Sequence, residues 1–132
     1  MDRINIPAPS ALAYYGDSVI ELLVREKLIK TGISNAGQLN KLSREFVTAQ
    51  KQSECLENIL PILSEGEIDI FKRGRNMHGN HPKSASVSDY RRATGFEVLM
   101  GYLYKTDNCQ RAKQLFSLAY EDELSALPSS NA

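Results

Sequence analysis

A Gly-Asp step inside a long, largely apolar run constrains this chain more than any other feature. The run starts with LAYYGDSVIE, residues 12–21, and it continues to Leu28. Burying a charged group costs free energy unless a cation or hydrogen-bond donors meet it. We therefore expect Asp17 to have a cationic partner in the folded protein.

A second carboxylate, Glu97, has the same setting about eighty residues later. It lies in TGFEVLMGYLY, and a helix that is apolar on nearly every side is buried. Two acidic groups on two helices are how helical bundles build metal sites, and all-oxygen ligands favour Mg²⁺ or Mn²⁺. The alternative is that each carboxylate pairs with an arginine, such as Arg25, Arg91 or Arg92.

Apolar residues recur at helical spacing along the chain, and no segment alternates as a strand does. We predict an all-α fold of six or so helices in one domain, residues 10–124, between an extended lead-in (1–9) and a flexible tail (125–132). Gly16 falls inside the first helix, where glycine costs up to ~1 kcal/mol, so we expect another helix to approach closely there. The predicted helices are 11–30 with Ser10 as N-cap, Ser34 or Asn35 to Val47, Thr48 to Pro61, Ser64 to Gly74, Ser86 or Ser88 to Lys105, and Asp107 or Asn108 to Leu124.

The bulk composition is that of an ordinary globular domain. Of 132 residues, 16 are Lys or Arg and 16 are Asp or Glu, so net charge alone does not argue for a nucleic-acid partner. The first residues lack the core of a signal peptide and no apolar run reaches ~18 residues, which indicates a cytoplasmic protein. Cys55 and Cys109 match no zinc or redox spacing, so we interpret them as reduced structural thiols, with a disulfide as the alternative.

The charges are distributed unevenly, with a basic segment from Lys72 to Arg92. It holds six Lys or Arg and both histidines, His78 and His81, and only Asp89 opposes them. A basic loop on an otherwise acidic protein is typical of contact with a phosphate backbone, although a merely solvated loop is the alternative. The two histidines lack a nearby third ligand, so RNA contact or solvent exposure is favoured over a metal site.

Two segments resemble the motifs of a known family. LAYYGDSVIELLV resembles the ribonuclease III signature, and TGFEVLMGYLY is similar to the family's second acidic segment. KRGRN and a polar loop lie between them, and no segment for a double-stranded-RNA-binding domain follows. This combination is similar to the short branch called Mini-III ribonuclease.

The resemblance implies an all-helical, homodimeric endoribonuclease that cuts double-stranded RNA with Mg²⁺ or Mn²⁺ and leaves 5′-phosphate and 3′-hydroxyl ends. It implies that Asp17 and Glu97 are the catalytic metal ligands and that Tyr14 packs across the dimer. The implied substrate is precursor 23S ribosomal RNA, and a large-subunit ribosomal protein is a further candidate partner. The implied RNA-binding residues are Lys72, Arg73, Arg75, Asn76, His78 and Lys83.

The chain departs from the larger relatives at two positions. Ala13 and Thr94 stand where those relatives carry two further acidic residues, so water and RNA phosphate oxygens would have to complete the metal's coordination. A different class of function therefore remains open: a non-catalytic ribonuclease-III-like domain that binds RNA or the ribosome. A plain helical interaction module with ion-paired carboxylates is a third interpretation.

Overall fold

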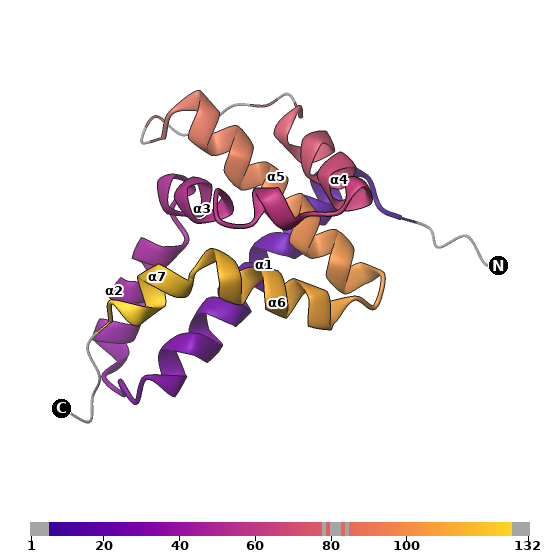
Figure 1. Ribbon diagram of the computed structural model, residues 1–132. Coiled ribbons are helices and arrows are strands. Elements are labelled where there is room, and N and C mark those ends of the chain that lie inside the picture. Colours follow the sequence, from indigo (N-terminus) through magenta and orange to yellow (C-terminus); the bar gives the residue numbers. More distant parts are fainter. Residues whose placement is uncertain (1–5, 78, 80–82, 84, 128–132) are drawn as a thin grey trace.

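The part of the chain described by the computed structural model, residues 6–77, 79, 83 and 85–127, is helical and contains no strand, as predicted (Figure 1). Two long helices, one from each half of the chain, carry the two isolated carboxylates. The elements are α1 (Pro9–Lys30), α2 (Ala36–Phe46), α3 (Ala49–Leu56), the 3-10 turn η1 (Leu60–Ile62), α4 (Glu65–Arg75), α5 (Val87–Lys105), α6 (Cys109–Ala119) and α7 (Glu121–Ser125).

Most helix starts are set by local capping, as the sequence predicts. The side chains of Asn35, Thr48 and Ser86 accept hydrogen bonds from backbone N–H groups three residues on. Ser64 and Glu67 form a complete capping box, with bonds of 3.1 and 2.9 Å. These four starts therefore need no tertiary contact to be specified.

Three predicted boundaries are wrong. Helix α1 begins at Pro9 instead of after Ser10, because proline is preorganised for the first helical position and Ala8 is the N-cap. Helix α3 ends at Leu56, and only the 3-10 turn η1 contains Pro61, since proline and the residue before it disfavour a continuing α-helix. Helix α4 continues through Gly74 to Arg75, because this glycine serves packing rather than termination.

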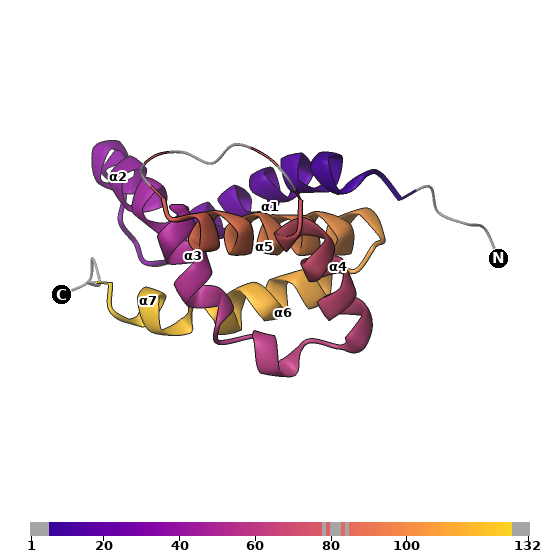
Figure 2. The same ribbon diagram turned by 90° about the horizontal axis from the view of Figure 1, so that it is seen from above.

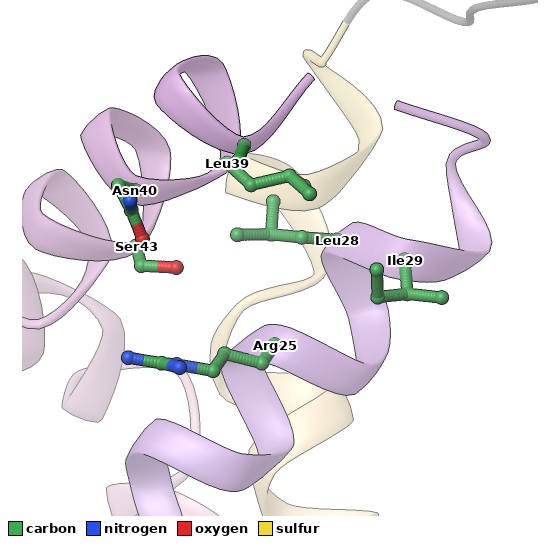
Figure 3. Close-up of a pocket in the computed structure, with 7 residues that line it drawn as sticks. Arg25, Leu28, Ile29, Leu39, Asn40 and Ser43 are labelled. Atoms are coloured by element: carbon green, nitrogen blue, oxygen red, sulfur yellow. The ribbon is translucent and has the colours of Figure 1, made fainter. Parts of the chain in front are cut away.

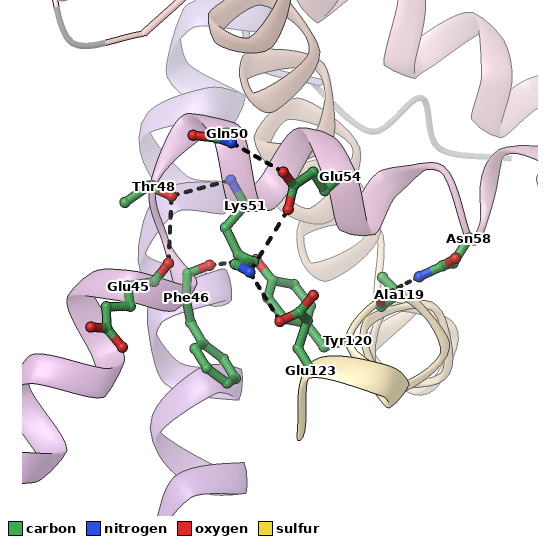
Figure 4. Close-up of polar contacts among 10 residues, drawn as sticks. All are labelled: Glu45, Phe46, Thr48, Gln50, Lys51, Glu54, Asn58, Ala119, Tyr120 and Glu123. Carbon is green, nitrogen blue, oxygen red and sulfur yellow. Dashed lines mark hydrogen bonds and ion pairs between the residues drawn. The ribbon is translucent and has the colours of Figure 1, made fainter. Parts of the chain in front are cut away.

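The predicted last helix is divided at Tyr120. This residue is fully buried, its hydroxyl donates to the Phe46 carbonyl at 2.7 Å, and its ring stacks on Phe46 and Phe116. Helix α7 then turns back toward α3, where Glu123 accepts from Lys51 at 3.0 Å (Figure 4). The contacts of Tyr120 with Phe46, which is distant in the sequence, therefore interrupt a segment that local periodicity predicted to be one helix.

Helix α5 is the centre of the fold and packs against α1, α3, α4 and α6. Figure 2 shows α1 on one side of α5 and α6 on the other. Its buried residues are Ala93, Gly95, Phe96, Val98, Leu99, Met100, Gly101 and Leu103. Among the described residues, no helix is long and apolar enough to cross a membrane.

Both cysteines are free, so the disulfide alternative is wrong. Cys55 is buried, and this burial raises the pKa of its thiol to about 12. A thiol that stays protonated at neutral pH is a poor nucleophile, which fits the structural role predicted for it.

Candidate active site

The site is built where α1 crosses α5 with no side chain between the two backbones. A Cβ added to Gly16 would collide with the carbonyl oxygen of Glu97 and lie 2.9 Å from the nitrogen of Gly101. A Cβ added to Gly101 would in turn meet the carbonyl of Leu12. The close approach predicted from Gly16 is therefore confirmed, and it brings Asp17, the next residue of α1, to the level of Glu97 on α5.

The carboxylate of Asp17 is close enough to Glu97 to perturb it. Burial raises the pKa of Glu97 to about 8, and the negative charge and hydrogen bonding of Asp17 add to the same shift. Glu97 is partly buried, whereas Asp17 is exposed. Burial of Asp17 was therefore the wrong expectation, because α1 buries only one face and Asp17 lies at its edge.

Two of the three arginines proposed as alternative partners are engaged elsewhere. Arg25 pairs with Glu21 at 3.2 Å within α1. Arg92 pairs with Glu57 of α3 at 2.8 Å. No ion pair within the described part of the chain includes Asp17 or Glu97. Glu97 is therefore left with a raised pKa and with no ion-pair partner among the described residues to offset its charge.

The donor set suits a hard divalent cation. The described residues contain no group of three or more His, Cys, Asp or Glu that could hold a metal. Two carboxylates remain, and Mg²⁺ is characteristically bound by one or two carboxylates together with water and substrate phosphate. At the two positions of departure, Ala13 offers no ligand atom, and the Thr94 hydroxyl donates within its own helix to Tyr90 at 2.9 Å.

The predicted RNA-binding residues lie in the last turn of α4 and in the segment that follows it. Lys72 and Arg73 are exposed in the last turn of α4, and Lys83 is exposed farther along the chain. Arg75 is held in place, with its guanidinium 5.8 Å from the centre of the Phe71 ring and its Nε donating to Asn76 at 3.2 Å. The predicted contact His78, like His81, lies outside the described residues.

Tyr14, predicted to pack across a dimer, is not part of the core. It is 85% exposed on α1, and its neighbour Tyr15 is 41% exposed. Further along the same helix, Leu22 and Ile29 are also exposed. An apolar surface of this kind on a helix beside the candidate site is typical of an interaction surface.

A concave pocket exists elsewhere and is separate from the carboxylates. It lies between α1 and α2, and Figure 3 shows the Arg25 side chain at one end of it. Its volume is about 200 Å³, and it is lined by Arg25, Leu28, Ile29, Ala36, Leu39, Asn40 and Ser43. The carboxylate pair can nevertheless be reached from the surface, because Asp17 is exposed.

Two features of this region escaped the sequence analysis. Gly101 was not recognised as the counterpart of Gly16, although a glycine within an apolar helix is the available signal. Arg91 was counted as part of the basic segment, but its position next to Arg75 depends on how α4 packs on α5, which spacing alone does not give.

Comparison with known proteins gives consistent matches. The family model described as Ribonuclease III domain matches residues 10–108. A protein named Mini-ribonuclease 3 from Desulfitobacterium hafniense is 46% identical over 76% of this chain, an alignment that spans 64% of the relative. Proteins of the same name from Symbiobacterium thermophilum and Brevibacillus brevis are each 38% identical, over 84% and 88% of this chain and 86% and 87% of their own.

A solved structure has the same fold. A crystal structure of a Fusobacterium nucleatum protein superimposes with a TM-score of 0.81 and 28% sequence identity. The match covers 93% of this chain and 99% of that protein, so the arrangement of helices described above is shared along nearly the whole length.

Proposed function

Because the chain belongs to the ribonuclease III family, within the group of Mini-ribonucleases 3, it is an endoribonuclease, and we propose that it uses Asp17 and Glu97 to bind a divalent metal and hydrolyse double-stranded RNA. The observation that carries this proposal is the carboxylate pair at the α1–α5 crossing. Burial and the neighbouring Asp17 charge raise the pKa of Glu97, and neither carboxylate has an arginine partner among the described residues.

The two carboxylates would have different tasks. Glu97 projects from the rigid central helix and would fix the position of the ion, whereas the exposed Asp17 would hold it on the side open to RNA. Since the pKa of Glu97 is raised to about 8, occupation of the site at neutral pH requires release of its proton. The bound Mg²⁺ or Mn²⁺ would supply an activated water and neutralise charge on the phosphate.

The finer parts of the proposal concern the substrate and partners. The substrate would be a base-paired stem of precursor 23S ribosomal RNA in the cytoplasm, cut to 5′-phosphate and 3′-hydroxyl ends. A large-subunit ribosomal protein is a candidate for presenting that stem. The active form would be a homodimer with Tyr14 in its interface, because an aromatic side chain that is 85% exposed is costly to leave in water.

The test is incubation of the protein with a double-stranded RNA, with and without Mg²⁺. We expect cleavage only with the metal, and we expect Asp17→Asn and Glu97→Gln each to reduce it at least a hundredfold while the helical circular-dichroism spectrum is retained. Glu21→Gln is the matched control, since Glu21 lies on the same helix but pairs with Arg25.

The outcomes separate the proposal from its rival. Undiminished cleavage by both carboxylate variants would remove the metal-ligand assignment. Wild-type protein that binds double-stranded RNA but does not cut it in Mg²⁺ or Mn²⁺ would instead favour the non-catalytic RNA-binding domain.

A further inference from the structure

The arginines of the basic segment have different roles once the chain is folded. Arg92 is directed to α3, where its Nε donates to the Ser53 hydroxyl at 2.8 Å and its terminal nitrogen donates to Glu57, also at 2.8 Å. That charge is neutralised within the protein, and Arg92 joins α5 to α3. It is therefore a poor candidate for a phosphate contact, despite its place in the basic segment.

Arg75 and Arg91 converge on one open depression between the end of α4 and the start of α5. Its volume is roughly 530 Å³, and its lining consists of Arg75, Asn76, Val87, Ser88, Arg91 and Arg92. Among the residues that the structure describes, neither Arg75 nor Arg91 forms an ion pair. Asp89, the one acidic residue of the segment, does not line the depression.

The depression adjoins the carboxylate site along α5. Arg91 also lines a smaller hollow together with Thr94, three residues on, and Glu97 follows after three more. Six residues of α-helix rise ~9 Å, so Arg91 lies less than two turns before Glu97 along α5. The packing of Gly74 against Gly95 and Val98 fixes α4 on α5 and hence the separation of the two arginines.

We propose that Arg75 and Arg91 together bind a single phosphate of the RNA backbone beside the scissile bond. The assignment rests on the proposed function and deepens it by naming a second contact point for the substrate. Guanidinium groups bind phosphate through paired N–H donors, and they are more weakly hydrated than ammonium groups. Arg75 is already oriented by the Phe71 ring and Asn76, so little side-chain freedom is lost on binding.

The experiment measures binding of a double-stranded RNA to the full chain in chelator, where no cleavage occurs, over a series of salt concentrations. Arg91→Ala and Arg75→Ala should each weaken binding roughly five- to tenfold at 0.1 M salt, and removing both should lower the slope of log affinity against log salt by about one, because the two arginines neutralise one phosphate. Arg91→Lys should recover part of the affinity but not all of it, because it keeps the charge and loses the paired N–H donors of the guanidinium.

A control and a double variant make the test specific. Arg44→Ala removes an equal charge from the exposed surface of α2 and should leave the affinity and the slope unchanged. If the two arginines share one phosphate, the double variant Arg75→Ala, Arg91→Ala should lose clearly less than the sum of the single losses.

An unchanged affinity of Arg91→Ala would overturn the assignment, and fully additive losses would overturn the shared phosphate. Cleavage by the wild type in Mg²⁺ is measured in parallel. If the wild type cleaves while Arg91→Ala binds normally, the proposed function stands and only this inference fails. If the wild type neither binds nor cleaves double-stranded RNA, the proposed function is wrong, and the phosphate contact that rests on it is wrong as well.

Discussion

Gly16 of α1 and Gly101 of α5 pack backbone against backbone, and a Cβ added to either would lie 2.9 Å from the other's nitrogen. This contact sets how closely the two helices approach, and so it sets the spacing of Asp17 and Glu97. The candidate site therefore depends on two residues that have no side chain.

Replacing Gly16 by alanine should damage both stability and activity. The added Cβ would occupy the position of the Glu97 carbonyl oxygen, and backbone cannot yield as a flexible side chain does. We expect a loss of about 3 kcal/mol or more in the free energy of unfolding, measured by urea denaturation, with a matching loss of cleavage. Gly66→Ala is the control, because its nearest neighbour is the Ser64 hydroxyl at 4.0 Å; equal losses in both variants would contradict the role of the crossing.

The stability of the metal-free protein should fall as pH rises through the range set by Glu97. Its pKa is about 8 in the folded protein against 4.5 for the ordinary group, so between these values only the folded state holds the proton. The free energy of unfolding should therefore decline from about pH 4.5 to about pH 8, by at most ~1.4 kcal/mol per pH unit.

Urea midpoints at pH 6 and pH 8 in chelator check this decline. Glu97→Gln should flatten it, and Mg²⁺ should restore stability at pH 8, because the ion stabilises the ionised pair. A decline of the same size in the glutamine variant would assign the effect to another group.

The ion pair between Glu67 and Arg111 should contribute stability with the opposite pH dependence. Arg111 donates to both carboxylate oxygens at 2.8 and 2.9 Å, and its charge and hydrogen bonds lower the pKa of Glu67. The contribution is complete above about pH 4.5 and is lost as pH falls through the lowered pKa. Glu67→Gln should cost roughly 1–3 kcal/mol at pH 7 by thermal or urea denaturation, since glutamine keeps one acceptor oxygen but removes the negative charge and the second acceptor for Arg111.

Glu65→Gln provides the comparison for this prediction. Glu65 lies in the same first turn of α4 but is exposed, and we expect its loss to change stability by no more than about 0.5 kcal/mol. Indistinguishable effects of the two substitutions would mean that the bonds to Arg111 contribute no net stability.

Tyr14→Glu should convert a dimer into a monomer. Tyr14 is 85% exposed, so the substitution disturbs no core contact within the subunit, while a charge buried in an interface would be unpaired. Light scattering should report half the mass of the wild type, with the helical spectrum unchanged. Leu118→Glu, on α6, is the control for a charge added to an exposed apolar residue; a Tyr14→Glu protein that stays dimeric would place the interface elsewhere.

Local signals predicted much of the fold. The caps at Asn35, Thr48, Ser64 and Ser86 and the length of α5 follow from short-range chemistry, and the structure confirms them. The predicted helix boundaries were wrong where a contact between residues far apart in the sequence determines the end of a helix. Gly74 was interpreted as a stop signal, yet it makes room for Val98, and Tyr120 interrupts a periodic segment because Phe46, far away in the chain, accepts its hydrogen bond.

The sequence by itself determined that this chain is helical and that Asp17 and Glu97 are the candidate metal ligands. Helix capping and the spacing of apolar residues depend only on residues that are near one another in the chain. Only the tertiary structure decided that Asp17 is exposed, that Arg25 and Arg92 have other partners, and that Arg91 joins Arg75 at one depression. The physical reason is that burial and ion pairing depend on which helix faces meet. Here, the glycine contacts between α1, α4 and α5 fix that choice.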